Sequence, residues 1–532
     1  MSKKFKTQHE HDAYVAEKKK NKTIWGVIMA SSLGTLIEWY DFYIFGSLAV
    51  VLATKFFPAD NPTAAFLSTL ATFAAGFVVR PFGALFFGRL GDIIGRKYTF
   101  LVTLLIMGFS TFLIGCVPSF ETIGYAAPVL VLILRLLQGL ALGGEYGGAA
   151  TYVAEYSQPH RRGYWTSWIQ TTATAGLFIS LIVILVTKTS LTPEEFDGWG
   201  WRIPFWISIL MVGVSYVIRR NMKESPLFAK AKKEGKTSTN PLKESFGNKL
   251  NFKFVLLALF GAVMGQGVIW YTGQFYAMSF MQKVMNLESA QVDSMMALAL
   301  FLGTPLFILF GWLSDKVGRK PIMMIGMLIA IIAYRPIYKT MYNSVNIEEK
   351  VLAPKGLVEK RTAIAHEKIA GDSLISFHTE KTFTDGTLLK RESIVHWAAT
   401  GPVITNGKAE APLVKESITV NPDTRWLLIF LVFVQVVFVT MVYGPIAAFL
   451  VEMFPIRIRY TSMSLPYHIG NGIFGGLLPA VATYLVTSGK DAGHPEWYLQ
   501  GLWYPIIVAA VCLVIGTLYL KTKNKSLEED QH

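Results

Sequence analysis

The sequence is poor in cysteine and in charged side chains. Only two cysteines occur in 532 residues, Cys116 and Cys512. They lie in opposite halves of the chain, so neither a disulfide framework nor a thiolate metal site is predicted. Charged residues make up 16% of the chain, against about 25% in soluble domains. The sequence also has no Walker-type phosphate loop and no cysteine–histidine cluster with metal-ligand spacing. We therefore expect no metal and no cofactor, and ATP-driven pumping by this chain alone is disfavoured.

Long hydrophobic runs are abundant instead. The chain is 52% hydrophobic with a mean hydropathy of +0.40, and a bilayer-spanning helix needs about 20 mostly apolar residues. The polar N-terminus is too long for the head of a signal peptide, so we expect the first span to be retained. The sequence predicts an all-α membrane protein with twelve spans, near 24–53, 63–87, 98–117, 123–154, 164–187, 203–220, 254–281, 292–313, 321–340, 425–450, 461–486 and 502–521.

The net charge of +14 is distributed in a way that indicates topology rather than a nucleic-acid partner. Basic residues crowd alternate loops, and the segment from Arg219 to Lys253 holds ten Lys/Arg against three Asp/Glu. The intervening loops "FFPADNPT", "TPEEFDGWG" and "NLESAQVD" are neutral or acidic. By the positive-inside rule, we expect both termini in the cytoplasm.

An internal repeat divides the spans into two halves. "GRLGDIIGRKY" from Gly88 and "GWLSDKVGRKP" from Gly311 are 223 residues apart, whereas "EYSQPHRR" from Glu155 and "EMFPIRIR" from Glu452 are 297 apart. The difference of 74 residues matches one long segment between spans nine and ten. We therefore predict a cytoplasmic tail (1–23), a six-helix half (24–220), a cytoplasmic basic linker (221–253), three helices (254–341), an extracellular insertion (342–424), three helices (425–521) and a cytoplasmic tail (522–532).

The insertion holds ten Lys/Arg and eleven Asp/Glu, unlike the basic loops. Alternating residues in "SLISFHTEKTFTDGTLLKRESIVHW", with Asp385-Gly386 in the middle, predict a β-hairpin, and "VITNGKAEA" is a candidate for another. It could be an extracellular cap or docking element. We favour a tolerated insertion that has no role in transport, so that a Gly/Ser linker replacing Asn346 to Asn421 should leave uptake within a few-fold.

Several motifs resemble those of a known family. "GRLGDIIGRK" resembles the signature loop of the major facilitator superfamily, and "SDKVGRK" its weaker copy. "EWYDF", "RPFGALFFGRLGDIIGRK", "RLLQGLALGGEYGGAA", "PHRRGYW" and "EMFPIRIRYTS" resemble the metabolite:proton symporter family, whose carriers include those for proline and betaine, 2-oxoglutarate, citrate and shikimate. The resemblance covers every span and departs at the insertion. It implies two six-helix halves with a substrate site between them near mid-membrane.

The loop motif also makes physical sense by itself. Its glycines let helix ends approach closely, and Asp92 can accept hydrogen bonds at the N-terminus of a neighbouring helix, whose dipole favours an anion. The resemblance implies a latch that stabilises the state closed to the cytoplasm; the alternative is that the basic residues only determine topology. The latch candidates are Gly88, Gly91, Asp92, Gly95, Arg96, Asp315, Arg319, Glu155, Arg162 and Glu452.

Ionisable residues in mid-span occur only in the first half. A charged residue at a helix centre costs about 2.5–3.5 kcal/mol on insertion scales, so each needs a reason. Asp41 in the first span and Arg135 in the fourth are the natural pair, and related sugar porters imply that the acid takes the proton. A static salt bridge is the alternative. Glu38 is a second candidate for proton coupling. Substrate-binding candidates in this half are Arg80, Arg135 and Gln138.

Polar and aromatic residues that interrupt the spans of the second half are candidates to complete the cavity: Gln266, Trp270, Tyr271, Gln274, Tyr467 and Asn471. We expect a bacterial inner-membrane symporter, proton-driven and working as a monomer among membrane lipids, for a small carboxylate-bearing metabolite. An organic acid is preferred over a zwitterionic osmolyte. A non-transporting nutrient receptor is the alternative from another class, and no nucleophile–base pair indicates an enzyme.

Overall fold

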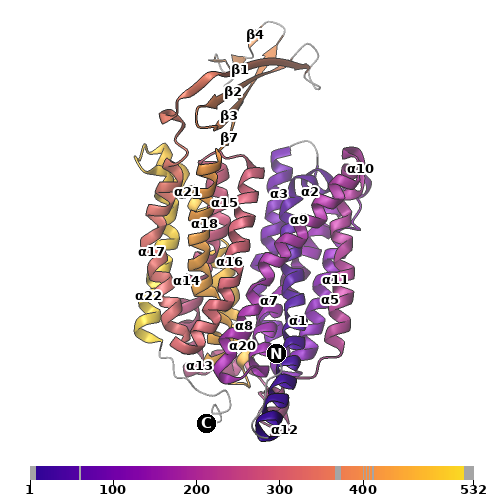
Figure 1. The fold of residues 1–532 in the computed structure, drawn as a ribbon. Helices are drawn as coiled ribbons and strands as arrows, with labels where there is room; N and C mark the ends of the chain where they lie inside the picture. Colours follow the sequence, from indigo (N-terminus) through magenta and orange to yellow (C-terminus); the bar gives the residue numbers. More distant parts are fainter. Residues whose placement is uncertain are drawn as a thin grey trace.

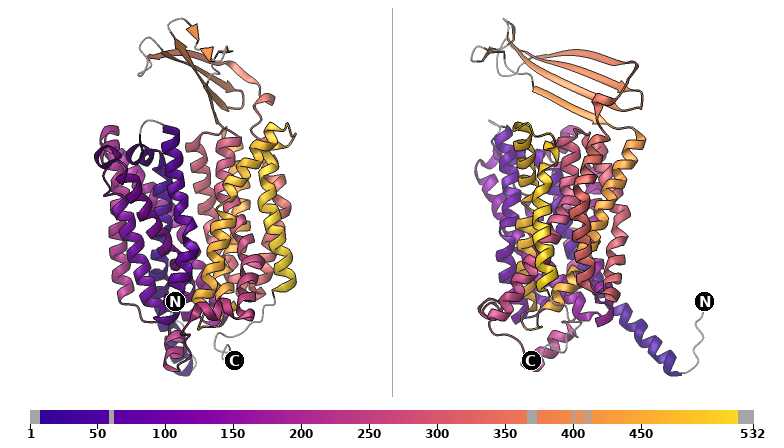
Figure 2. Two further views of the ribbon diagram at one scale, coloured as in Figure 1. Left: turned by 180° about the vertical axis from the view of Figure 1, so that it is seen from behind. Right: turned by 90° about the vertical axis from the view of Figure 1, so that its left-hand side faces the viewer.

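The computed structural model describes residues 8–58, 62–365, 373–398, 401–402, 404–405, 408–409 and 413–520. Two groups of long helices stand side by side, and a β-sheet stands beyond their ends on one side (Figures 1 and 2). We call this the insertion side. Helix α1 (Gln8–Ser47) begins and α22 (Trp503–Tyr519) ends on the opposite side, which we call the termini side.

The first group, the N-terminal half, runs from α1 to α11. Its helices after α1 that form the spans are α3 (Pro62–Val78), α4 (Arg80–Ile93), α5 (Arg96–Ile114), α7 (Ala126–Tyr156), α8 (Arg162–Gln170), α9 (Thr172–Ser190) and α11 (Ile203–Arg220). Short helices α2 (Ala49–Phe56) and α10 (Pro193–Gly198) lie at the insertion side, and α6 (Phe120–Ile123) lies between α5 and α7 in the chain. Helix α12 (Pro226–Lys233) lies in the basic linker.

The second group, the C-terminal half, contains interrupted helices. Span seven consists of α13 (Lys249–Ala258), α14 (Met264–Tyr271) and α15 (Ala277–Ser279), joined by π-helical segments η4 (Leu259–Val263) and η5 (Thr272–Tyr276) and followed by η6 (Phe280–Val284). The remaining helices are α16 (Ser289–Val317), α17 (Arg319–Asn343), α18 (Pro422–Tyr443), α19 (Ile446–Met453), α20 (Arg459–Ile469), α21 (Leu478–Asp491) and α22, with the π segment η8 (Gly470–Gly475) after α20.

The helical body has the surface of a membrane protein. Within the described residues, ten helical segments are long and apolar enough to cross a membrane, and α1–α2 and α3–α4 occupy the first two predicted spans. Large apolar side chains point outward along these helices, among them Phe82, Phe86, Leu185, Leu210 and Ile332. Apolar side chains exposed on this scale suit a lipid surrounding rather than water.

Two helices differ in extent from the sequence prediction. Span two is broken where α3 ends at Val78 and α4 begins at Arg80, because Pro81 has no backbone N–H to continue the helix. Helix α1 begins at Gln8, so the polar segment expected to be a tail up to residue 23 is helical from there on. A run of Lys, Glu and Ala residues favours helix whether or not it lies in the membrane.

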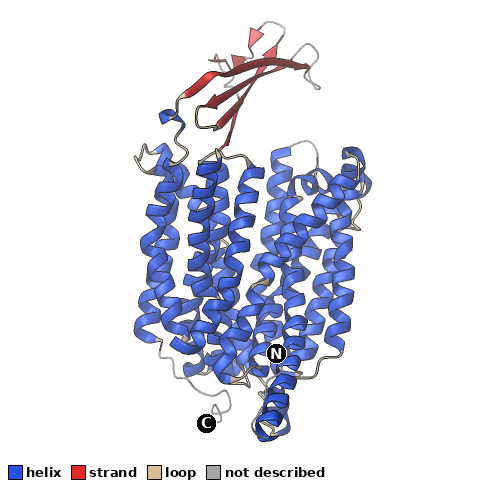
Figure 3. Cartoon of the chain, in the orientation of Figure 1, coloured by secondary structure: helices blue, strands red, loops and turns tan. Residues whose placement is uncertain are grey.

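The insertion is a sheet, and among the described residues strands occur only there (Figure 3). Antiparallel strands β2 (Ser373–Phe383) and β3 (Leu388–Ala398) form the predicted hairpin, with Gly386 at a positive φ of 85° in its turn. Strands β5 (Ile404–Thr405) and β6 (Lys408–Ala409) pair within "VITNGKAEA". The sequence analysis missed β1 (Leu352–Ala365) and β7 (Leu413–Thr419), which pair with β2 and β3, and β4 (Gly401–Pro402).

The base of the sheet is built into the C-terminal half. Ile418 N donates to Asn286 O at 2.8 Å, and Glu288 N donates to Ile418 O at 2.9 Å. Gln291 bonds to both backbone groups of Val420, at 2.9 and 3.0 Å. Ile418 and Val420 are buried in the largest hydrophobic cluster of the molecule's described part. The insertion therefore cannot be cut out at its sequence boundaries without removing part of the helical core.

Trimming the deletion should keep the helical half intact. We expect a Gly/Ser linker replacing residues 352–412 to preserve β7 and its bridge to Leu287. Uptake by this variant should stay within a few-fold of the parent. The longer replacement of residues 346–421 also removes Ile418 and Val420. It should lower the apparent Tm by several degrees, since burial of each aliphatic side chain contributes about 1.5–3 kcal/mol to the free energy of unfolding. Differential scanning fluorimetry and labelled-substrate uptake would check both variants. A complete loss of uptake in a folded 352–412 variant would contradict this.

A hydrogen-bonded node centred on Asp385, in the β2–β3 turn, lies at the end of the sheet next to the start of α18. Asp385 accepts bonds from Lys350, Thr387 and Asn421. Partial burial raises the pKa of Asp385, but the bonds from Lys350 and Thr387 outweigh this and lower it from 3.8 to about 2. A carboxyl with a depressed pKa stabilises the folded state fully above its unfolded value, and that contribution is lost as the pH falls through about 2.

Asp385→Ala is thus expected to reduce the protection of the β2–β3 turn against hydrogen exchange by a constant amount from pH 7 down to about pH 4. After discounting for solvent exposure the effect should be about 1 kcal/mol. The difference between variant and parent should shrink between pH 4 and pH 2. A difference that is absent at pH 7 would contradict the role assigned to this node.

Candidate functional site

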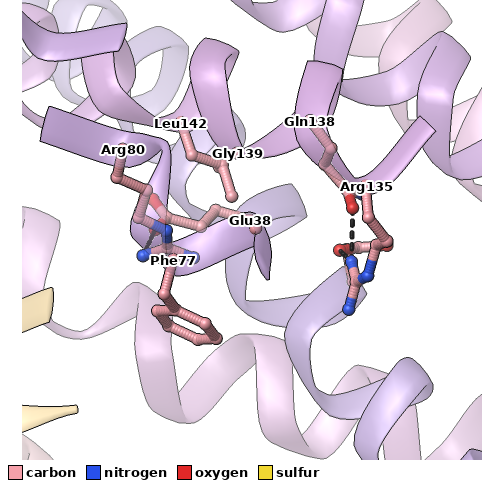
Figure 4. A pocket seen from close by; sticks show the side chains of 9 residues that line it. Glu38, Phe77, Arg80, Arg135, Gln138, Gly139 and Leu142 are labelled. Carbon is pink, nitrogen blue, oxygen red and sulfur yellow. Dashed lines mark hydrogen bonds and ion pairs between the residues drawn. The ribbon is translucent and has the colours of Figure 1, made fainter. Parts of the chain in front are cut away.

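A small cavity lies inside the N-terminal half (Figure 4). Its volume is about 10 Å³, which leaves room for roughly one water molecule. Metabolite pockets are far larger, about 300–1,000 Å³, so the cavity is closed around its own side chains in this conformation. Its walls come from α1, α3, α4 and α7 and comprise Glu38, Asp41, Gly76, Phe77, Arg80, Arg135, Gln138, Gly139 and Leu142.

Asp41 and Arg135 form the tighter of two ion pairs at this cavity. Arg135 Nη1 donates to Asp41 Oδ2 at 2.8 Å, and the two side chains are 5% and 3% exposed. The Arg135 guanidinium also lies over the Phe45 ring at 3.7 Å and donates to Gln138. The second oxygen of Asp41 has no hydrogen-bond partner among the described residues. Removing one member of such a buried pair typically costs 3–5 kcal/mol, because the other charge is left uncompensated.

Glu38 and Arg80 form the second pair, one helical turn along α1 from the first. Arg80 Nη1 donates to Glu38 Oε1 at 3.2 Å, with side chains 15% and 10% exposed. The Arg80 guanidinium lies 4.3 Å from the centre of the Phe77 ring. This pair is looser and more open than the first. All five ionisable or amide candidates of the N-terminal half thus meet at one cavity.

Thr111 on α5 belongs to this site and was missed by the sequence analysis. Gln138 Nε2 donates to Thr111 Oγ1 at 2.7 Å, while the Gln138 carbonyl accepts from Arg135. Thr111 therefore holds the amide that orients the guanidinium. A threonine within an apolar span gives no sequence signal of this role, because serine and threonine also satisfy themselves by bonding to a preceding carbonyl, as Thr111 does to Met107.

Thr111→Val should raise the KM for substrate more than it lowers the maximal rate. The valine leaves one buried N–H of Gln138 unsatisfied, which costs about 1–3 kcal/mol, and the guanidinium loses its fixed orientation. Initial uptake rates at varied substrate concentration would measure the split. Thr111→Ser is the matched control and should behave like the parent. Identical KM values for the valine and serine variants would contradict the positioning role.

The candidates in the C-terminal half separate into an amide pair and an aromatic cluster. Gln266 and Asn471 exchange two hydrogen bonds of 3.1 Å between α14 and η8. Trp270 lies against Tyr271, and its ring centre is 4.9 Å from that of Trp39 on α1. Gln274 is buried one turn further along span seven, and is not among the residues that line the cavity. The aromatic cluster therefore faces the first helix of the opposite half.

On the termini side, Asp92 connects the two halves. Its carboxylate accepts from the backbone N–H groups of Tyr460 and Thr461, at 3.3 and 2.8 Å, and from the Thr461 hydroxyl at 2.8 Å. These are the first N–H groups of α20, which have no partner within the helix, and the helix dipole favours an anion there. A Cβ added to Gly88 would lie 2.9 Å from Thr461 Cα, so glycine is needed for this approach.

Asp315 makes the corresponding contact in the repeat. It accepts from Gly163 N and Tyr164 N at the start of α8, both at 2.8 Å. Here the C-terminal half supplies the carboxylate and the N-terminal half the helix N-terminus, the reverse of the Asp92 arrangement. The two contacts are related by the internal repeat and close the same side.

The remaining latch candidates form two charged clusters beside these contacts. Glu452 pairs with Arg162 at 3.2 Å and with Arg319 at 3.1 Å. Glu155 pairs with Arg96 at 3.6 Å and with Arg459 at 3.0 Å, so both clusters join the halves. Gly91 lies against the Tyr460 ring, and Gly95 directly precedes α5 at a φ of 139°. The structure therefore brings all ten candidates together on the termini side, and Arg459 is an addition that the sequence analysis missed.

The chain resembles known transporters in sequence and in fold. A family model described as "Sugar (and other) transporter" matches residues 26–253. The structure of the proton:xylose symporter XylE bound to 6-bromo-6-deoxy-D-glucose superposes with a TM-score of 0.65 at 16% identity, covering 96% of this chain and 98% of that one. The chain therefore has the fold of this major facilitator superfamily protein. The predicted fold, twelve helices in two halves with a small β-containing insertion, is confirmed.

Curated relatives match almost the whole length of this chain. The proline/betaine transporter of Escherichia coli (strain K12) is 29% identical over 94% of this chain and 84% of its own. The alpha-ketoglutarate permease of the same strain is 29% identical over 97% and 98%, and the citrate-proton symporter of Salmonella typhi is 28% identical over 93% and 94%. These relatives are named as a transporter, a permease and a symporter, which agrees with the predicted class of transporter.

Proposed function

We propose that this transporter is a proton-coupled symporter of a bacterial inner membrane that imports a small carboxylate-bearing metabolite by alternating access. The basic linker and the loops on the termini side support an orientation with both termini in the cytoplasm and the sheet outside. We take one chain as the working unit, since both halves that the latch joins lie within it. The latch then closes the cytoplasmic side in the conformation described.

The observation that carries this proposal is the buried pair of Asp41 and Arg135 at the cavity. While Asp41 is ionised, it holds the guanidinium. A proton bound to Asp41 removes the negative charge and releases Arg135 to bind a substrate carboxylate. A ligand drives a conformational change only through its different affinity for the two states, and the two protonation states of Asp41 supply that difference. Proton and substrate are therefore coupled through one cation.

An organic acid is our first candidate because two arginines line one cavity. Arg80 and Arg135 are held by Glu38 and Asp41 respectively, so the four charges cancel while both acids are ionised. Protonation of both acids would present two guanidinium groups, which suit a dicarboxylate. Two relatives carry the names alpha-ketoglutarate permease and citrate-proton symporter.

A zwitterion with an N-methylated cationic group is the second candidate, and the aromatic cluster favours it. Trp39 and Trp270 meet at the interface between the halves, and the Tyr271 ring lies against that of Trp270. Aromatic faces attract organic cations while an arginine binds the carboxylate. The relative named proline/betaine transporter supports the same class.

Uptake into proteoliposomes would test the proposal. Labelled 2-oxoglutarate, citrate, proline and glycine betaine should be offered with an acidic exterior, without a pH gradient, and with a protonophore. We expect one class to accumulate only with the gradient. Accumulation that follows a sodium gradient and ignores the protonophore would overturn proton coupling. Saturable binding without any transport would instead support a receptor.

A further inference from the structure

Three buried tyrosines lie between the cavity of the N-terminal half and the latch on the termini side. Tyr146 on α7 belongs to the N-terminal half, whereas Tyr443, the last residue of α18, and Tyr467 on α20 belong to the C-terminal half. The rings of Tyr146 and Tyr467 stack with centres 3.7 Å apart and planes 6° apart. Only Tyr467 was a candidate from the sequence.

The position of the stack follows from helix geometry. Leu142 lines the cavity, and Tyr146 is one turn further toward the termini side on the same face of α7, about 6 Å along the axis. Tyr460 and Thr461 receive the Asp92 latch, and Tyr467 is roughly two turns, about 10 Å, further along α20. Along the helix axes, the stack therefore lies between the latch and the cavity.

Hydrogen bonds hold each ring in place within its own half. The Tyr443 and Tyr467 hydroxyls are 2.6 Å apart, and Gln170 Nε2 donates to the Tyr146 hydroxyl at 2.8 Å. The stacking of Tyr146 on Tyr467 crosses the interface between the halves, and such a contact contributes about 0.5–1.5 kcal/mol beyond the area it buries.

We infer that Tyr146, Tyr443 and Tyr467 form an inner gate, the barrier that substrate must cross between the cavity and the termini side. The stack separates when the halves rock apart, because its two members belong to different halves. Its modest energy suits a contact that opens in every transport cycle, whereas the charged latch determines when the halves part. The separated hydroxyls then line the exit with polar groups. This gate is independent of the ion and of the substrate proposed above.

A reporter cysteine above the stack can test the gate without substrate. The parent carries Cys116→Ser and Cys512→Ser, which removes both native thiols, and Leu142→Cys at the cavity. A membrane-impermeant maleimide is applied to right-side-out and to inside-out vesicles, so that sidedness is measured directly. Tyr467→Ala removes the stacking ring, and Tyr467→Phe keeps the ring while removing the hydroxyl.

We expect Tyr467→Ala and Tyr146→Ala to increase labelling from the termini side about two- to thirteenfold, which is the range that a stacking energy of about 0.5–1.5 kcal/mol gives, with some addition from lost burial. Labelling in Tyr467→Phe should stay within twofold of the parent. Tyr467→Leu retains apolar volume without a π face, so it separates stacking from cavity formation and should also increase labelling. Equal labelling in the parent and in a monodisperse Tyr467→Ala variant would overturn the gate.

Discussion

Asp41→Asn is expected to abolish substrate accumulation driven by a pH gradient while preserving substrate binding and exchange. Asparagine has the shape of the protonated acid and carries no charge at any pH. Arg135 is therefore released permanently, and proton binding no longer changes the affinity for substrate. At least a hundredfold loss of gradient-driven accumulation should accompany a Kd within about fivefold of the parent. Counterflow of labelled substrate and isothermal titration would measure the two quantities.

Glu38→Gln is the matched control, because Glu38 lies on the same helix and holds the other arginine of the cavity. If the proton is carried by Asp41 alone, Glu38→Gln should retain gradient-driven accumulation with an altered affinity. Normal accumulation in Asp41→Asn together with its loss in Glu38→Gln would transfer the proton to Glu38. Arg135→Ala should lower accumulation more than either variant. It removes the cation proposed to bind the substrate carboxylate and leaves Asp41 as an unpaired charge in a buried site.

Asp92→Asn should open the termini side and lower uptake. The carboxylate accepts three hydrogen bonds from α20 and pairs with Arg96 at 3.1 Å. An amide presents one acceptor oxygen and one N–H₂ group to donors that need two acceptors, and it has no charge to meet the helix dipole. Hydrogen bonds to charged groups are worth about 1.5–3 kcal/mol. The Leu142→Cys reporter should therefore label at least fivefold faster from the termini side.

Asp315→Asn tests the same contact in the other direction, because Asp315 bonds to the start of α8. The two single variants should have similar effects and the double variant a larger one. Glu244 pairs with the exposed Arg457 on the same side, so Glu244→Gln serves as a control that should change neither labelling nor uptake. Unchanged labelling in a folded Asp92→Asn variant would reduce the loop motif to a topology signal.

The sequence alone was sufficient for the architecture. Span length, the basic loops and the repeat of "GRLGDIIGRKY" in "GWLSDKVGRKP" depend on local composition. The bilayer also restricts each apolar span to a helix of about 20 residues. The same holds for the β2–β3 hairpin, whose Asp-Gly turn and alternation are local signals. Ionisable residues in apolar spans also stand out by themselves, since their cost in lipid makes an accidental occurrence rare.

Only the tertiary structure decided which of these residues meet. The pairing of Arg80 with Glu38, the Thr111–Gln138–Arg135 chain and the tyrosine stack join residues from different helices, and tyrosine or threonine in a span has the same local pattern whether it packs, gates or positions. The base of the sheet gave no signal either. Ile418 and Val420 resemble any short strand in sequence, and their burial depends on Gln291 and Asn286 more than a hundred residues earlier. Periodicity indicates which face of a helix is apolar, whereas the partner of a polar group is determined by how the two halves pack around one another.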